Sequence, residues 1–144
     1  MTSQLLLGST IIIANAVFHV SCLVWLAGLI KSIGTSANFH PNRRGLVLLL
    51  GIAVLGLIAI HTTSAWAWAV VYLTVGEFAE LSDALYFSVV TSTTLGYGDI
   101  TLSEGWRLLA SFEAMGGLIL FGASTAFLLA VTRSWFGHLD RAGD

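Results

Sequence analysis

Long and nearly uncharged apolar runs dominate this chain. The three longest extend from Leu5 to Ile30, from Gly45 to Thr74 and from Leu108 to Val131, and Glu113 in the third carries their single charge. Each run exceeds the ~20 residues that an α-helix needs to cross the ~30 Å hydrocarbon layer of a bilayer. The pattern therefore predicts an all-α membrane protein with three transmembrane helices.

The stretch from Val75 to Arg107 is more polar, and we do not expect it to span a membrane. Within it, the segment from Asp83 to Thr93 predicts a short helix, which Ser82 or Asp83 can cap with a side-chain oxygen. The C-terminal end of this helix would direct a partial negative charge at the residues that follow. A short amphipathic helix on the membrane surface is the alternative interpretation.

The five residues from Thr94 to Gly98 have the sequence Thr-Leu-Gly-Tyr-Gly. Glycines at alternate positions let the backbone enter positive φ, which other residues adopt only at a cost. Successive carbonyl groups can then all point to one side, and rings of such carbonyls replace the water shell of a potassium ion. The motif therefore predicts an ion-binding loop directly after the short helix.

Composition and charge support a membrane protein. Hydrophobic residues make up 56% of the 144 residues and charged residues 10%, and the mean hydropathy is +0.87. The formal net charge of −2 gives no sign of nucleic-acid binding. Cys22 is the single cysteine and excludes an intrachain disulfide. We therefore expect membrane lipids as surroundings, and neither nucleic acid nor a soluble substrate as a partner.

The distribution of basic residues predicts an orientation. Lys31, Arg43 and Arg44 flank the first connection, and Arg133 and Arg141 follow the third apolar run. Of the basic residues only Arg107 lies on the other side, where five acidic residues gather, namely Glu77, Glu80, Asp83, Asp99 and Glu104. Since cytoplasmic loops carry the excess of Lys and Arg, we expect the N-terminus outside and the C-terminus in the cytoplasm.

From residue 45 to residue 132 the chain resembles the pore unit of the potassium channel superfamily, and it is most similar to bacterial channels with two membrane helices per subunit. The segment from Asp83 to Thr93 looks like the short pore helix of that family. The segment from Thr94 to Gly98 matches its selectivity filter, with Leu95 where valine is commoner. Trp106-Arg107-Leu108 opens a helix that is similar to its inner helix. The first apolar run has no counterpart in the two-helix type.

The resemblance implies a four-fold symmetric homotetramer in a bacterial plasma membrane, which passes potassium ions passively and is not an enzyme. The domain organisation that follows is an extra N-terminal transmembrane helix with its cytoplasmic connection at 1–44, a pore domain at 45–133 and a short cytoplasmic tail at 134–144. Within the pore domain we expect the re-entrant pore helix at 83–93, the filter at 94–98 and the inner helix at 105–133.

The resemblance also assigns the ion site. Potassium ions, which are the permeant species and not a cofactor, should be coordinated by the carbonyls of Thr94, Leu95, Gly96 and Tyr97 and by the Thr94 hydroxyl. Gly98 and Asp99 should shape the outer mouth. Related bacterial channels often carry a pore-helix carboxylate that pairs with this aspartate, but Val90 stands at that position here. We therefore expect the hydroxyl of Tyr86 to bind Asp99 and support the filter.

The inner helix carries further candidates. Glu113 lies within a membrane helix, where a carboxylate is costly and a functional candidate by default. We expect it to support the filter from behind by hydrogen bonding Thr or backbone groups, with an ion site as the alternative. By the resemblance, Gly117 is a gating hinge, with close helix packing as the alternative. The residues expected to line the cavity and the path below it are Leu118, Phe121 and Thr125.

Polar residues also occur at matching depths on the first two helices. Asn15, His19 and Cys22 share one face of the first helix, and His61 lies at a similar depth on the second. The pattern predicts a polar contact between these helices, which is the commoner use of such residues in membranes. A metal site built from the two histidines and Cys22 is the alternative.

Three other functions remain open at this stage. A weakly selective cation pore would have the same architecture, and an accessory subunit that conducts nothing would leave the filter motif unexplained. The sequence Gly96-Tyr97-Gly98-Asp99 also fits the G-x-G-D motif of intramembrane aspartyl proteases. That chemistry needs a second, facing carboxylate, and none of the three apolar runs contains an aspartate.

Overall fold

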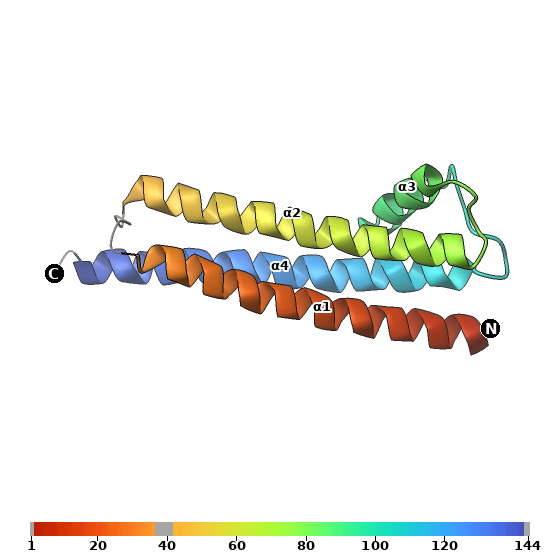
Figure 1. Cartoon of the computed structure of the whole chain (residues 1–144), viewed down its shortest axis with the longest axis horizontal. Helices are drawn as coiled ribbons and strands as arrows, with labels where there is room; N and C mark the ends of the chain where they lie inside the picture. Colours follow the sequence, from red (N-terminus) through yellow and green to blue (C-terminus); the bar gives the residue numbers. More distant parts are fainter. Residues whose placement is uncertain (1, 37–41, 143–144) are drawn as a thin grey trace.

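The computed structural model describes residues 2–36 and 42–142, with side chains as far as Trp135. The described residues form helices and no strand, in the order α1 (Thr2–Gly34), α2 (Arg43–Thr74), α3 (Leu81–Ser92) and α4 (Arg107–Ala142). Figure 1 shows the three long helices side by side and α3 near one end of them. Three segments, Thr2–Gly34, Arg43–Thr74 and Arg107–Trp135, are long and apolar enough to cross a membrane. The all-helical prediction with three membrane-length helices is confirmed.

The two ends of α2 are fixed by local hydrogen bonds. The side-chain oxygen of Asn42, the N-cap residue, accepts a hydrogen bond from the backbone N–H of Gly45 at 2.9 Å. Beyond the other end, Gly76 has a φ of +80° and Glu77 N–H donates to the Tyr72 carbonyl at 3.0 Å. A glycine takes this left-handed conformation without strain, and so the chain reverses toward α3.

The short helix α3 begins earlier than the sequence predicts. Its N-cap is Glu80, which makes no side-chain capping bond, and both Ser82 and Asp83 lie inside the first turn. The prediction that Ser82 or Asp83 caps this helix is therefore wrong. Asp83 instead places an acidic group in the first turn, where it interacts favourably with the helix dipole. The helix ends at Ser92, with Thr93 as its C-cap.

The last helix is longer than the sequence predicts. α4 begins at Arg107 and runs to Ala142, so it continues through most of the segment that we expected to be a tail. Charged residues after Val131 end the apolar run, beginning with Arg133, but arginine is a good helix former and does not end the helix. Residues 143 and 144 lie outside the described part of the chain.

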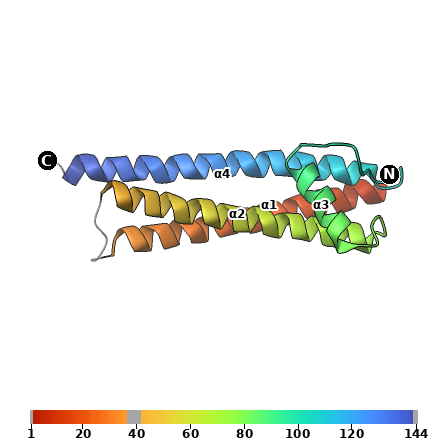
Figure 2. The same ribbon diagram turned by 90° about the horizontal axis from the view of Figure 1, so that it is seen from above.

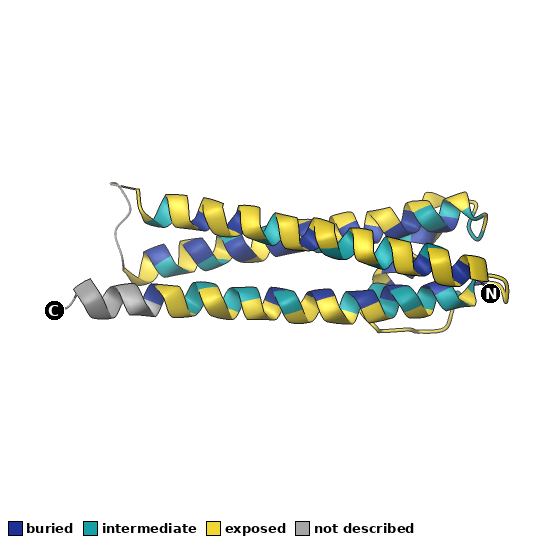
Figure 3. Cartoon of the chain, turned by 90° about the horizontal axis from the view of Figure 1, so that it is seen from below, coloured by how far each residue is buried: buried dark blue, intermediate teal, exposed yellow. Residues whose placement is uncertain are grey.

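Buried residues occur on all three long helices (Figure 3), and most of the apolar ones belong to two clusters. At the end where α2 begins, Leu26, Leu49, Ala53, Leu57 and Trp135 form the first cluster. The second lies near α3 and is formed by Trp68, Ala69, Tyr72, Ala84, Phe87, Leu102 and Leu109. Apolar side chains also cover the outside, among them Leu6, Val17, Trp25, Val47, Leu55 and Ile58. Such an outer surface suits lipid rather than water.

The extra helix α1 packs along both α2 and α4 and extends to the end where α3 lies (Figure 2). A side-chain oxygen of Gln4, which is buried, accepts a hydrogen bond from the backbone N–H of Leu108 at 3.3 Å. This bond satisfies one of the free amides at the start of α4. Gly8 lies against the ring of Phe112, where a Cβ would overlap it. The first helix is therefore an integral part of the bundle.

Candidate functional site

The chain leaves α3 by folding back against its last turn. The N–H of Thr94 donates to the Thr91 carbonyl at 2.9 Å, and the Val90 carbonyl accepts from both Leu95 N–H and Gly96 N–H at 3.0 and 3.2 Å. One carbonyl of the helix thus serves two amides of the loop. This arrangement fixes where residues 94–98, called the filter loop from here on, begin relative to α3.

The backbone φ angle alternates in sign along the filter loop. Thr94, Gly96 and Gly98 have φ values of +59°, +54° and +76°, whereas Leu95 and Tyr97 lie outside the positive region. A backbone that alternates in this way turns successive peptide planes to the same side, which is the geometry that the glycine spacing predicts. The sequence did not indicate that Thr94 would also have a positive φ. A β-branched residue at positive φ is strained, and such strain gathers at functional sites.

The filter loop is largely uncovered in the single chain. The side chains of Leu95 and Tyr97 are 54% and 67% exposed. Around the Cβ positions of Gly96 and Gly98 the described residues leave open space within 4 Å. Beside the loop lies a hollow of about 560 Å³, whose wall includes Phe87, Gly98 and Arg107. One copy of the chain therefore does not enclose this loop.

A hydrogen bond joins Tyr86 of α3 to Asp99, the residue that follows the filter loop. The Tyr86 hydroxyl donates a hydrogen bond to Asp99 Oδ2 at 2.7 Å, which confirms the predicted contact. The bond lowers the pKa of the Asp99 carboxyl and raises the pKa of the Tyr86 hydroxyl from their ordinary values. Both changes have the same cause, because the hydroxyl hydrogen stabilises the carboxylate.

The connection from the filter loop to α4 has its own anchor. The carboxylate of Glu77, which follows α2, accepts hydrogen bonds from the backbone N–H and the hydroxyl of Ser103 at 2.7 and 2.6 Å. Sequence reasoning did not identify this pair. It ties the two connections on either side of α3 together.

Glu113 is buried behind α3, with 1% of its surface exposed. Its two carboxyl oxygens lie 2.5 Å from the hydroxyls of Tyr72 on α2 and Ser88 on α3. The expectation that Thr or backbone groups would bind it is therefore wrong, since the partners are two other hydroxyls. Neither partner could be found from the sequence, because 41 and 25 residues separate them from Glu113.

Gly117 lies where α4 crosses the end of α3. A Cβ at Gly117 would overlap the backbone carbonyl of Ser92. α4 passes through Gly117 as one uninterrupted helix. The structure therefore assigns this glycine a close-packing contact, and its role as a gating hinge stays a prediction.

The three residues expected to line the pore are all exposed in the single chain. Leu118, which is 67% exposed, and Thr125 lie on the outward face of α4. The ring of Phe121 stacks on the ring of His61, with centroids 4.1 Å apart and planes at 9°. Phe121 thus contacts α2, and it remains 39% exposed.

A polar cluster joins the three long helices in the middle of the bundle. The Nε2 atoms of His19 and His61 lie 3.1 and 2.9 Å from the hydroxyl oxygen of Ser124, and their ring centroids are 5.0 Å apart. Ser64 donates to the side-chain oxygen of Asn15 at 2.8 Å. The predicted polar contact between the first two helices is confirmed, but the participation of Ser124 was not predicted.

Cys22 lies among apolar side chains next to the first core cluster. Within the described ranges, no three His, Cys, Asp or Glu side chains are grouped so that they could hold a metal ion. The structure therefore lends no support to the alternative of a metal site at Cys22 and the two histidines.

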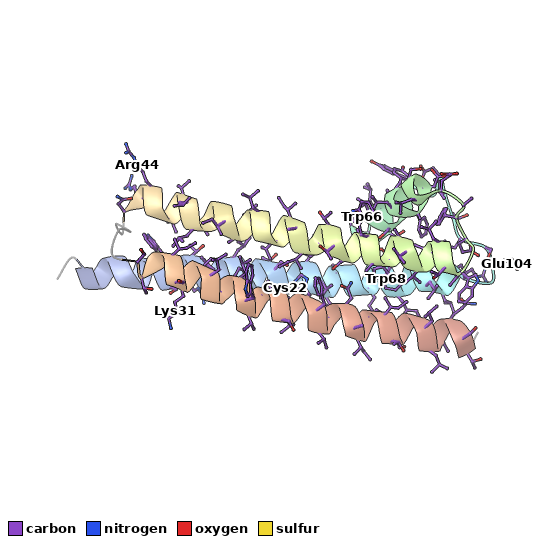
Figure 4. The ribbon with its side chains drawn as sticks, viewed as in Figure 1. Cys22, Lys31, Arg44, Trp66, Trp68 and Glu104 are labelled. Carbon is purple, nitrogen blue, oxygen red and sulfur yellow. The ribbon has the colours of Figure 1, made fainter. Side chains whose placement is uncertain are left out.

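Charges are separated along the bundle. Figure 4 shows Lys31 and Arg44 at the end where α2 begins, and Glu104 at the opposite end, beside α3. The filter loop lies at the acidic end, because it directly follows α3 (Figures 1 and 4). Negative charge near the mouth of a pore attracts cations.

Comparison with known proteins gives two matches. The family described as "Ion channel" matches residues 58–134, which is more than half of the chain. "Two-pore potassium channel 1" of Arabidopsis thaliana is 30% identical over 88 residues, which are 60% of this chain and 23% of that protein. The chain thus spans about a quarter of the length of this curated relative. No solved structure gives a significant match.

Proposed function

This chain belongs to the ion channel family, and on that premise we propose that four copies form a pore that conducts potassium ions passively across a membrane. Its three membrane-length helices make it an integral membrane protein. A channel is not an enzyme, so family membership excludes the protease reading of the G-x-G-D motif.

The observation that carries the proposal is the alternating backbone of the filter loop. Positive φ at Thr94, Gly96 and Gly98 suits a row of carbonyls directed to one side. The proposed ion ligands are the carbonyls of Thr94, Leu95, Gly96 and Tyr97, together with the Thr94 hydroxyl. Carbonyl dipoles can replace the hydration shell of potassium one ion after another in single file.

The exposure of the filter loop supports a tetramer. Leu95 and Tyr97 are more than half exposed, and open space lies next to Gly96 and Gly98. A ring of carbonyls needs a loop from each of several chains around one axis. We propose that neighbouring copies cover these side chains and fill the hollow beside the loop.

The helix α3 is the proposed pore helix. It is 12 residues long, too short to cross a membrane, and it ends directly before the filter loop. The partial negative charge at its C-terminal end would favour a cation in the central cavity. The N-terminus and the acidic end are proposed to face outward, since the basic residues Lys31, Arg43 and Arg44 lie at the opposite end.

Flux through the purified full chain in liposomes tests the proposal. Vesicles loaded with potassium should lose it rapidly when the membrane potential is set to drive it out, and sodium efflux under the same drive should be much slower. Empty liposomes are the control for leak. Equal fluxes of the two ions would favour a weakly selective cation pore, and no flux of either ion would contradict conduction altogether.

A further inference from the structure

Three helices meet at the carboxyl group of Glu113, behind the proposed pore helix. Glu113 extends from α4, the Tyr72 hydroxyl from α2 and the Ser88 hydroxyl from α3. All three side chains are fully buried or nearly so, at 1%, 0% and 0% exposure. The Ser88 oxygen also lies 2.9 Å from the backbone carbonyl of Ala65 on α2. The group thus contains three short oxygen–oxygen contacts.

Counting hydrogens decides how these contacts are made. Three contacts need three hydrogens, but a tyrosine and a serine hydroxyl supply one each, and a backbone carbonyl supplies none. The remaining hydrogen can come only from Glu113, as a carboxylic acid. Every contact is then satisfied, because Ser88 donates to Ala65, Glu113 Oε1 donates to Ser88, and Tyr72 donates to Glu113 Oε2.

If Glu113 were charged, one of these three contacts would lack a hydrogen bond. Its two oxygens could only accept, so Ser88 would have to give its one hydrogen either to Glu113 or to Ala65. The other contact would bring two oxygens together with no hydrogen between them. The hydrogen-bond partners of Glu113 are two neutral hydroxyls and not a cation, and burying an unpaired carboxylate is expensive.

The surroundings offer few other groups that change charge. Tyr72 from α2 contacts Glu113 directly, and α3 contributes Ser88, which does not titrate in water. Glu113 also lines a cavity of about 200 Å³, and His61 of α2 and Asn15 of α1 form other parts of its wall. Among the described residues that line this cavity, His61 is the one other titratable side chain.

We propose that Glu113 is a positioning residue that holds α3 as a protonated acid, and that alkaline pH releases this hold and lowers conduction. Ser88 lies one turn before Ser92, so its position fixes the end of α3 from which the filter loop departs. Losing the acid hydrogen would break the bond to Ser88 and bring a charge behind the pore helix. The effect on conduction rests on the proposed function, whereas the protonated state itself does not.

The matched variants are Glu113→Gln and Glu113→Ala in the full chain. A glutamine can make both hydrogen bonds, because its amide N–H donates to Ser88 and its carbonyl accepts from Tyr72. Unlike the carboxylic acid, it does not ionise at alkaline pH. Potassium flux of Glu113→Gln in liposomes at neutral pH should stay within about twofold of the parent, and that of Glu113→Ala should fall roughly tenfold. On alkaline titration the parent should lose flux and Glu113→Gln should not.

Infrared spectroscopy of the same proteins gives a measurement that does not depend on conduction. The parent should show the carbonyl stretch of a protonated carboxylic acid at neutral pH, and this band should be absent from Glu113→Gln. Absence of the band from the parent, or an identical alkaline decline of flux in both proteins, would overturn the inference. A parent with the band but no potassium flux would contradict the proposed function and leave the protonated contact standing.

Discussion

The backbone carbonyl of Ser92, the last residue of α3, lies against Gly117 of α4, where a side chain cannot fit. Two residues later the chain enters the filter loop at Thr94 with a positive φ. The contact therefore sets how closely the proposed pore helix approaches the inner helix. A hinge at Gly117 would have to bend α4 at the point where it supports α3.

Replacing Gly117 by alanine tests this contact. The added Cβ overlaps the Ser92 carbonyl, and overpacking of this kind costs about 1–3 kcal/mol. We expect a lower thermal stability and a loss of potassium flux. Gly122→Ala is the matched control, because its Cβ would meet no described atom within 4 Å apart from the backbone of its own helix and its neighbours in the chain. A Gly117→Ala protein of unchanged stability but altered opening would support the hinge instead.

Gly96→Ala should abolish potassium flux without unfolding the chain. Gly96 has a φ of +54° and open space around its Cβ position, so the cost is conformational and not steric. An alanine would turn the backbone out of the alternation and move carbonyls away from the ions. The control is Gly76→Ala, because Gly76 also has a positive φ, of +80°. It lies before α3 and outside the filter loop, so the same backbone strain should not affect the ion ligands. Selective flux in Gly96→Ala as fast as in the parent would contradict the assignment of the filter.

The Tyr86–Asp99 bond predicts how conduction responds to acid. The pKa of Asp99 lies below its ordinary value of 3.8, because the Tyr86 hydroxyl donates to the carboxylate. The support that this bond gives is complete above that ordinary value and is lost as the pH falls through the lowered pKa. Flux through the parent should therefore stay level from neutral pH down to 3.8 and decline only below it.

Tyr86→Phe removes the hydroxyl and keeps the ring. We expect the acid decline to begin at a higher pH than in the parent, and current to be lost faster during sustained openings. A double-mutant cycle with Asp99→Asn measures the coupling, since the two changes should not add when they break the same bond. Identical acid profiles for Tyr86→Phe and the parent would show that the bond does not support the filter.

Ser124→Ala tests the polar cluster that joins α1, α2 and α4. His19 and His61 would both lose their shared hydroxyl inside the membrane, which should lower stability by about 1–3 kcal/mol. Thr132→Val is the control, because the Thr132 hydroxyl bonds the Leu128 carbonyl of its own helix. Thermal unfolding in detergent measures the stability of both variants relative to the parent. Equal losses in the two variants would mean that Ser124 does not join the helices.

Local features of the site could be predicted because they depend on consecutive residues. The conformation of the filter loop follows largely from its glycines, since Gly96 and Gly98 occupy positions of positive φ that they enter without strain. The three membrane helices likewise follow from the length of three apolar runs. The Tyr86 contact could be predicted because α3 places this residue only 13 positions before Asp99.

The remaining contacts depend on how the helices are rotated against one another, which the sequence alone did not determine. These membrane helices carry apolar side chains on every face, so hydrophobic periodicity does not indicate which face packs against a neighbour. Tertiary packing alone brings Tyr72 and Ser88 to Glu113, and Ser124 to His19. It likewise places Gly117 against Ser92, because only the crossing of α3 and α4 makes a small residue necessary there.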